Sequence, residues 1–187
     1  FISTLESKVN RLKTMQEEYQ GYYQGVRLLL KNKEKLDGIH HTVLDTIAVD
    51  PRYNDALDSA LGGVLQHIIV EDAQAARKAI EFLKSKQAGR ATFLPLNVIK
   101  PRNITSDIVT GLTQFEGYIG TLNTLITADH KYKNIIDNIA GHIIIATTLA
   151  EANKIAKFVS YRHKVVTLDG QVVNPGGSMT GGSKQKP

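Results

Sequence analysis

Residues 1–26 carry apolar side chains at alternating spacings of three and four positions. The series is Ile2, Leu5, Val9, Leu12, Gln16, Tyr19, Tyr23 and Val26, and only Gln16 is polar. This heptad spacing predicts a coiled-coil helix over residues 1–25, whose partner helix lies outside this sequence or in another chain. The alternative is an amphipathic helix packed on its own domain. We expect the helix to continue through the basic segment that follows and to end at Gly38.

Two later stretches of the chain share one pattern. Residues 49–63 and 67–83 resemble residues 128–142 and 143–159. The matched positions include Asp50 with Asp129, Tyr53 with Tyr132, and Asp58 with Asp137. A repeat this long that occurs only twice does not indicate a solenoid. It predicts two related α/β halves packed about a pseudo-twofold axis.

Each half reads as a short helix, a buried strand, a second helix and a second strand. The predicted elements are helices 55–61 and 134–139, buried strands 65–70 and 142–146, helices that open at Asp72 and at Thr148 with Glu151, and strands 91–96 and 164–170. Strand, helix and strand in this order predict a parallel pair joined by a crossover. Asp169-Gly170 indicates a hairpin turn, and residues 97–111 read as the linker between halves.

Composition narrows the function only slightly. The net charge of +5 and pI near 9.3 favour an acidic partner such as nucleic acid. Basic residues gather at both ends, at Arg27, Lys31, Lys33 and Lys35 and at Lys184 and Lys186, where they could neutralise phosphates or form a solvated face. The chain has no cysteine, which excludes disulfides and thiolate-bridged zinc. No apolar run is long enough to span a bilayer.

The sequence contains no recognisable catalytic motif. The segment "GGSK" (181–184) comes nearest to a phosphate-binding loop, but no helix follows it. We interpret Asp50 and Asp129 as turn or N-cap residues and not as a two-carboxylate site. His67 and His142 precede buried strands, where a structural, hydrogen-bonded role is expected. We therefore predict no catalytic residue, no metal site and no cofactor.

Several segments closely resemble the hinge domain of bacterial SMC proteins, the structural maintenance of chromosomes family. They are "GVRLLL", "YNDALDSALGGVLQHIIVED", "AIEFLKSKQAGRATFLPL" and "VVTLDGQVVNPGGSMTGG". The resemblance covers nearly the whole chain, and "GRATFLPL" and "NPGGSMTGG" are its most specific parts. It implies a hinge-like α/β (α+β) fold, with a coiled-coil stub at 1–25, subdomain I with the linker at 26–110, and subdomain II at 111–187.

The resemblance also implies a function. SMC hinges are homodimerisation modules that join two long coiled-coil arms, and the ATPase heads lie at the far ends of those arms. Carried over, the dimer-interface residues are Gly176, Gly177, Gly181 and Gly182. The basic residues after the motif, Lys184 and Lys186, imply contact with DNA without sequence preference, although Gln185 interrupts the run. Arg27 and Lys31 are further DNA-contact candidates at the coil.

We therefore predict a non-catalytic homodimerisation hinge of a bacterial chromosome condensation and segregation ATPase, which is cytoplasmic and associated with the nucleoid. Its expected partners are a second copy, DNA and the antiparallel return helix of the same parent chain, of which this sequence reads as a fragment. Two backbones that approach closely leave no room for a side chain, which suits glycine. The alternative is a small nucleotide-binding α/β domain that uses the glycine-rich tail as a phosphate loop.

Overall fold

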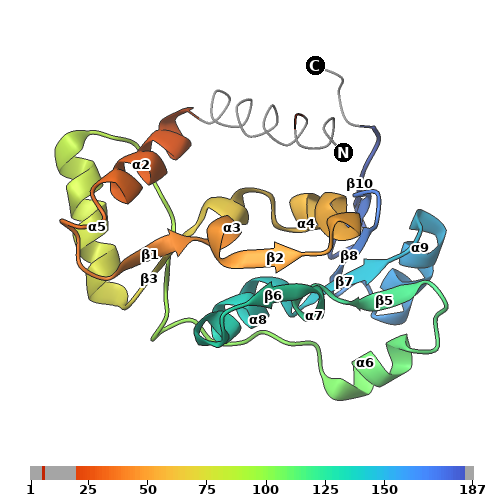
Figure 1. Ribbon diagram of the computed structural model, residues 1–187. Coiled ribbons are helices and arrows are strands. Elements are labelled where there is room, and N and C mark those ends of the chain that lie inside the picture. Colours follow the sequence, from red (N-terminus) through yellow and green to blue (C-terminus); the bar gives the residue numbers. More distant parts are fainter. Residues whose placement is uncertain (1–5, 7–19, 184–187) are drawn as a thin grey trace. The chain divides into compact units, whose positions relative to one another are not determined.

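The computed structural model describes Glu6 and residues 20–183 (Figure 1). The chain divides into two compact units, and each is described by itself. Unit 1 comprises residues 1–43 and 66–98, and unit 2 comprises residues 44–65 and 99–187. The segment 44–65 thus groups with unit 2, although it lies within the predicted subdomain I. The predicted boundaries of the two subdomains stay a prediction, as does the coil over residues 1–25, most of which lies outside the described residues.

Unit 1 is a three-stranded sheet with two helices. Its elements are α2 (Gln20–Lys31), β1 (Ile39–Thr42), β3 (Ile68–Val70), α5 (Ala73–Lys86) and β4 (Phe93–Pro95). The strand order is β1-β3-β4, with β1 antiparallel and β4 parallel to β3. Figure 1 shows α2 beside α5, and their apolar faces form a core with β1 and β3 that includes Leu29, Ile68, Val70 and Ala79.

The prediction that the first helix ends at Gly38 was wrong. Helix α2 ends at Lys31, and turns lead from there to β1. The Asn32 side chain donates to the Leu28 carbonyl at 2.8 Å, a local bond that competes with continuation of the helix. Gly38 has φ +84°, and a Cβ there would lie 2.9 Å from the Cβ of Ala75. Glycine is therefore required for the turn into β1 and not for a helix cap.

Unit 2 contains a five-stranded sheet with the order β10-β9-β8-β7-β5 and a two-stranded sheet of β2 and β6. The strands are β2 (Ile47–Val49), β5 (Tyr118–Thr121), β6 (Ile126–Ala128), β7 (Ile143–Ala146), β8 (Lys164–Thr167), β9 (Val172–Val173) and β10 (Met179–Thr180). The α-helices are α4 (Asn54–Leu61), α6 (Ser106–Leu112), α7 (Leu122–Leu125), α8 (Lys133–Ala140) and α9 (Leu149–Phe158), and α3 (Val43–Thr46) spans the boundary between the units. The 3-10 turns are η1 (Pro51–Tyr53), η2 (Gly62–Gln66) and η3 (His130–Tyr132).

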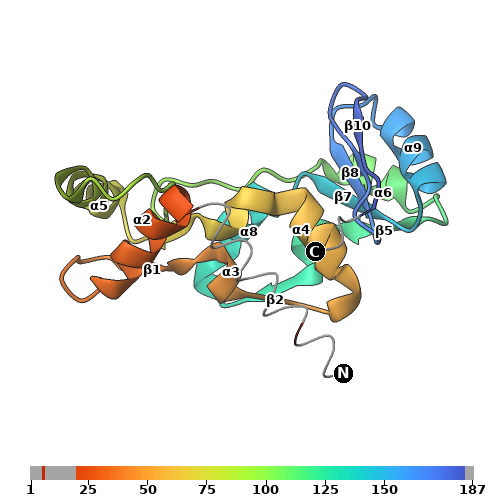
Figure 2. The same cartoon turned by 90° about the horizontal axis from the view of Figure 1, so that it is seen from above.

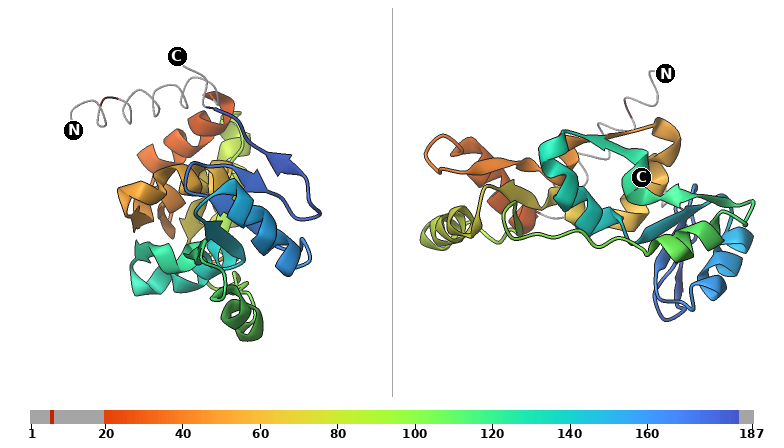
Figure 3. Two further views of the ribbon diagram at one scale, coloured as in Figure 1. Left: turned by 90° about the vertical axis from the view of Figure 1, so that its right-hand side faces the viewer. Right: turned by 90° about the horizontal axis from the view of Figure 1, so that it is seen from below.

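Helices α6 and α9 pack on the five-stranded sheet of unit 2. Figures 2 and 3 show the two helices alongside the sheet, and Leu112 of α6 and Ile155 of α9 are fully buried in one core with Ile144 and Val165. The expected linker over residues 97–111 is thus partly helical. Helix α6 begins inside it because Ile108, Val109 and Leu112 can pack onto this core.

The structure repeats one order of elements. Strand, helix and strand (β1, α3, β2) precede η1 and α4 in the first copy, and β5, α7 and β6 precede η3 and α8 in the second. A parallel strand pair with a crossover helix follows in each, β3-α5-β4 and β7-α9-β8, as the sequence predicts. Strands β2 and β6 pair antiparallel about Ala48 and Thr127, which occupy the same place in the two copies. This pairing is compatible with the pseudo-twofold relation, which stays a prediction.

Local sequence signals near the helix starts are confirmed. Asp50 and Asp129 each accept a hydrogen bond at 3.1 Å from the backbone N–H two residues on, at the start of η1 and η3. Asp72 accepts from Ala75 N at 2.8 Å, and Thr148 Oγ1 accepts from Glu151 N at 3.2 Å. These bonds satisfy helix N–H groups that have no partner within the helix.

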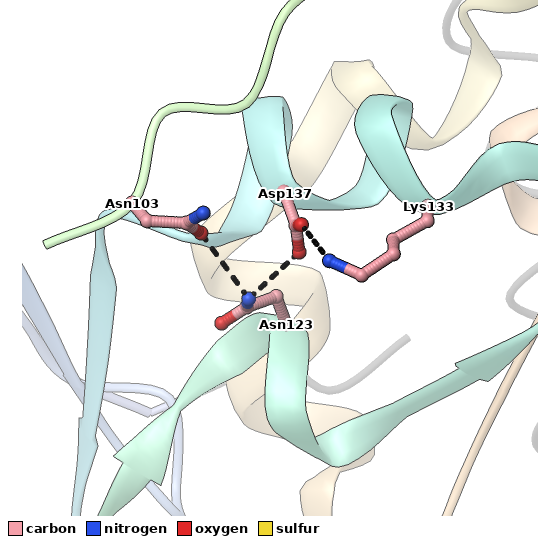
Figure 4. Close-up of polar contacts among 4 residues, drawn as sticks. All are labelled: Asn103, Asn123, Lys133 and Asp137. Carbon is pink, nitrogen blue, oxygen red and sulfur yellow. Dashed lines mark hydrogen bonds and ion pairs between the residues drawn. The ribbon is translucent and has the colours of Figure 1, made fainter.

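A buried carboxylate joins α7 and α8 in unit 2 (Figure 4). Asp137 accepts from Asn123 Nδ2 at 2.8 Å and from Lys133 Nζ at 2.6 Å, and Asn123 Nδ2 also lies 3.4 Å from Asn103 Oδ1. Burial raises the pKa of Asp137, but the bonds from Lys133 and Asn123 outweigh burial and lower it below its usual value. This network was not predicted, because Asn123 and Asp137 are distant in sequence.

We expect Asp137→Asn to destabilise the chain by about 1–3 kcal/mol near pH 7, because the amide cannot accept from both donors. A carboxylate whose folded pKa is lowered stabilises the fold above its unfolded pKa, and this stabilisation is lost as the pH falls through the folded value. The difference in unfolding free energy between variant and wild type should therefore be smaller at about pH 3 than at pH 7. Urea unfolding at both pH values measures it, with the exposed Asp107→Asn as control. A difference that stays constant with pH would contradict the account.

Candidate functional site

The glycine-rich segment forms a hairpin that ends the five-stranded sheet. Strand β10 pairs antiparallel with β9, with Met179 opposite Val173 and Thr180 opposite Val172. The turn between them contains Pro175, Gly176 and Gly177. The sequence predicted neither strand β10 nor its position at the edge of the sheet.

The four glycines have reasons to be glycine within one subunit. Gly176 and Gly177 have φ +88° and +104°, and Gly182 has φ +133°, conformations that strain any other residue. Pro175 followed by a glycine at positive φ is typical of a type II turn. A Cβ on Gly181 would collide with the Gln171 side chain. Replacement of all four by alanine would therefore strain the hairpin as well as any interface.

Two contacts hold this hairpin in place. Gly176 N–H donates to the Tyr161 carbonyl at 2.7 Å, which fastens the turn to the segment after α9. Gln171 Nε2 donates to the Gly182 carbonyl at 3.0 Å, and Gly182 N–H donates to Gln171 Oε1 at 2.8 Å. The Gln171 amide thus continues the ladder beyond β10 and sets the path of the chain there. Sequence reasoning missed Gln171, because its partner is a backbone group eleven residues away.

The outer edge of β10 is open in the described part of the chain. Asn174 N–H donates to the Ser178 carbonyl at 2.7 Å, so these two residues form a hydrogen-bonded pair. In an antiparallel ladder such pairs alternate, so the N–H and C=O of Met179 point away from β9. Met179 is 52% exposed. The edge therefore offers both unpaired backbone groups and apolar surface.

Among residues 20–183, no strand pairs with the outer edge of β4 in unit 1. Ile68 N donates to the Thr92 carbonyl and Leu96 N to the Val70 carbonyl, so alternate residues of this segment face β3. Phe93 and Pro95 consequently direct their backbone groups away from β3. Proline has no N–H to donate, so on this edge Phe93 offers both an N–H and a C=O to a further strand, whereas Pro95 offers only its C=O.

The basic candidates fall into two groups. Arg27 and Lys31 are exposed on α2. Lys184 and Lys186 lie outside the described residues. Basic residues outnumber acidic ones in unit 1, whereas they nearly balance in unit 2. Most of the positive charge of the chain is therefore in unit 1.

No site for a metal ion or a membrane span is found in residue 6 and residues 20–183. No group of three or more His, Asp or Glu side chains in this part could hold a metal ion. None of its helices combines the length and the apolar character that crossing a membrane requires.

Comparison with known proteins identifies the family of this chain. Residues 36–156 match the family described as the SMC proteins flexible hinge domain. The chain belongs to the SMC hinge-domain family. The resemblance seen in the sequence is thus confirmed, as is the mixed α/β fold class.

Curated relatives of this hinge are whole Smc proteins. It is 43% identical over 186 residues to the chromosome partition protein Smc of Bacillus subtilis, covering 100% of this chain and 16% of that protein. It is 39% identical over 178 residues to the Smc of Halothermothrix orenii, covering 95% of this chain and 15% of that protein. The chain thus spans less than a fifth of these relatives.

Solved hinge structures share its fold. A structure described as an asymmetric dimer of the Geobacillus stearothermophilus SMC hinge domain matches with a TM-score of 0.85 and 41% identity, covering 98% of this chain and 75% of that one. The Pyrococcus furiosus SMC hinge domain matches with a TM-score of 0.70 and 31% identity, covering 90% of this chain and 86% of that one.

Proposed function

We propose that this hinge joins two copies of a bacterial Smc chromosome condensation and segregation ATPase by homodimerisation, and that it catalyses no reaction itself. The open edge of β10 carries this proposal, since an unpaired strand edge next to exposed apolar surface is a ready surface for pairing with another chain. The hinge of Geobacillus stearothermophilus, which is a dimer, supports it. In the cell, the parent protein would act in the cytoplasm at the nucleoid.

The internal repeat indicates where the partner strand binds. In the second copy, β8 is covered on its outer side by β9 and β10. Its counterpart in the first copy, β4, has no strand on that side within the described residues. We infer that β10 of one subunit covers β4 of the other, which would join the five-stranded sheet of one copy to the three-stranded sheet of the second. Twofold symmetry would make this contact twice.

The four glycines take a definite role in this arrangement. The turn at Gly176 and Gly177 and the bonds of Gln171 to Gly182 hold β10 straight enough to pair. Gly181 follows β10, and because a Cβ there would collide with the Gln171 side chain, glycine at this position preserves the bonds between Gln171 and Gly182.

The nucleotide-binding alternative is not favoured. A phosphate loop needs free backbone N–H groups at the start of a helix. Here Gly181 and Gly182 follow an edge strand, and Gln171 Oε1 already accepts from the Gly182 N–H. The backbone of this segment is arranged for pairing with a strand and not for binding a phosphate.

Contact with DNA is the second part of the proposed function. Arg27 and Lys31 project from α2 into solvent in the unit that carries most of the positive charge. Lysine and arginine side chains on such a surface neutralise phosphates without reading bases. We infer that this face of α2 lies against the DNA backbone, and we propose Lys184 and Lys186 separately as DNA contacts.

Cross-linking tests the strand pairing cleanly, because the chain has no native cysteine. With Met179→Cys and Phe93→Cys in one chain, a short bis-maleimide should give covalent dimers. Either cysteine alone should give none in gel electrophoresis, because β10 would face β4 and not its own copy. Efficient dimer formation by Met179→Cys alone would show that two β10 strands pair and would contradict the proposed arrangement.

For DNA, we expect Arg27→Glu with Lys31→Glu to weaken binding to a random duplex and to reduce the slope of log K against log salt by about two. Exposed Lys131→Glu with Lys157→Glu in unit 2 makes the same change in charge and serves as the control. Fluorescence anisotropy at several salt concentrations measures the slopes. Equal losses of DNA affinity in both variants would mean that binding depends on the net charge of the chain and not on the α2 face.

A further inference from the structure

The chain turns sharply after α9, and two adjacent residues of this turn have positive φ. Ser160 has φ +57° and Tyr161 has φ +56°. In the described part of the chain, Gln87 at the end of α5 is the only other non-glycine residue with positive φ. This left-handed conformation strains a residue that carries a Cβ, and such strain persists where surrounding contacts require it.

A helix cap accounts for one of these two residues. The Ser160 N–H donates to the Lys157 carbonyl at 3.0 Å. The Tyr161 N–H donates to the Ala156 carbonyl at 2.8 Å. Together these bonds form a Schellman motif, which ends a helix and needs one left-handed residue, here Ser160. The positive φ of Tyr161 is therefore additional to what the cap requires.

The corresponding cap in the first copy shows the difference. At the end of α5, the Gln87 N–H donates to the Lys84 carbonyl at 3.2 Å. The Ala88 N–H donates to the Leu83 carbonyl at 3.1 Å. Gln87 alone is left-handed in this cap, and Ala88, which takes the place of Tyr161, is buried in the core of unit 1. The second left-handed residue thus belongs to the copy whose sheet continues into β9 and β10.

The additional left-handed residue brings Tyr161 to the glycine turn between β9 and β10. Its carbonyl accepts from the Gly176 N–H at 2.7 Å. Its ring lies next to the following residue, because a Cβ built on Gly177 would be 3.7 Å from Tyr161 Cδ1 and 4.0 Å from Cε1. Tyr161 therefore meets two consecutive residues of the turn, one through its backbone and one through its side chain.

The same face of the sheet carries Met179 of β10. Val173 pairs with Met179, and paired residues of an antiparallel ladder place their side chains on one face. Val173 packs in the core with Ala156 of α9, so Met179 lies on the face that α9 covers. Figure 2 shows α9 alongside this hairpin. Tyr161 follows α9, and both Tyr161 and Met179 are exposed.

The tyrosine side chain has no explanation in the backbone or in the core. Glycine would make the same backbone bonds at this φ without strain. Tyr161 is 40% exposed and is not part of the buried cluster that α9 forms with the sheet. The contact with the glycine turn is what remains to retain an aromatic ring at this position.

We propose that Tyr161 is a positioning residue for β10. Its ring holds the turn at Gly176 and Gly177 against the end of α9, in the form in which the edge of β10 pairs with a second copy. This inference rests on the proposed self-association, although the hold on the turn is a property of a single subunit.

Two variants separate the ring from the backbone. Tyr161→Asn removes the ring but suits a left-handed backbone, whereas Tyr161→Phe keeps the ring. In the Met179→Pro background, which excludes the proposed pairing, Tyr161→Asn should make amide exchange at Gly176 about tenfold faster. Tyr161→Phe should leave this exchange unchanged. Urea unfolding of Tyr161→Asn should need the same or a higher urea concentration, because the strain is relieved.

The effect on self-association is measured without the proline substitution. Sedimentation equilibrium should show a dimer that is about tenfold weaker in Tyr161→Asn and nearly unchanged in Tyr161→Phe. Gln87→Asn is the matched control, because it relieves the same strain at the corresponding cap of unit 1. It should change neither the exchange at Gly176 nor the dimer affinity.

The outcomes distinguish the role of Tyr161 from self-association itself. Unchanged exchange at Gly176 in Tyr161→Asn would overturn the positioning role. Unchanged dimer affinity in that variant, or an equal loss in Gln87→Asn, would overturn the link between the ring and pairing at β10. If the unchanged chain is a monomer, the proposed self-association fails, and exchange at Gly176 still decides whether the ring holds the turn.

Discussion

The unpaired hydrogen-bonding edge of β10 is the constraint on which the functional part of the structure depends. A strand of two residues cannot hold itself straight, so its position is set from both ends. The Tyr161 carbonyl fixes the turn before it, and the Gln171 amide fixes the backbone after it. Glycines at positive φ allow both contacts. The result is an edge whose outward N–H and C=O groups point away from β9.

The two copies of the repeat differ in what covers their last parallel strand. Each copy builds an antiparallel strand, a parallel pair and a crossover helix around its own small core. In the second copy, β9 and β10 cover β8, whereas no strand of residues 20–183 covers β4 in the first copy. One chain thus carries both an uncovered strand and a strand able to cover it. This complementarity favours a closed pair of subunits over an extended sheet.

Sequence reasoning predicted the elements whose signals are local. Asp50, Asp129 and Thr148 bind backbone groups within three residues, and Asp169-Gly170 forms the turn between β8 and β9. Sequence reasoning failed where the local structure depends on residues that are distant in the sequence. Helix α6 forms because its apolar side chains reach a core built from β7, β8 and α9, and Gln171 matters only because Gly182 lies opposite. The resemblance implied an interface role for four glycines, which stays a prediction, and it gave no sign that Gly176, Gly177 and Gly182 have positive φ.

In the proposed dimer, pairing at the β10 edge holds two hinges together, and sedimentation equilibrium of this chain beside Met179→Pro measures whether it does. Proline removes an N–H that faces away from β9, so the hairpin should survive while the contact between subunits is lost. We expect a dimer mass for the unchanged chain at micromolar concentration and a folded monomer for the variant. A monomeric unchanged chain, or a variant that dimerises as tightly, would contradict it.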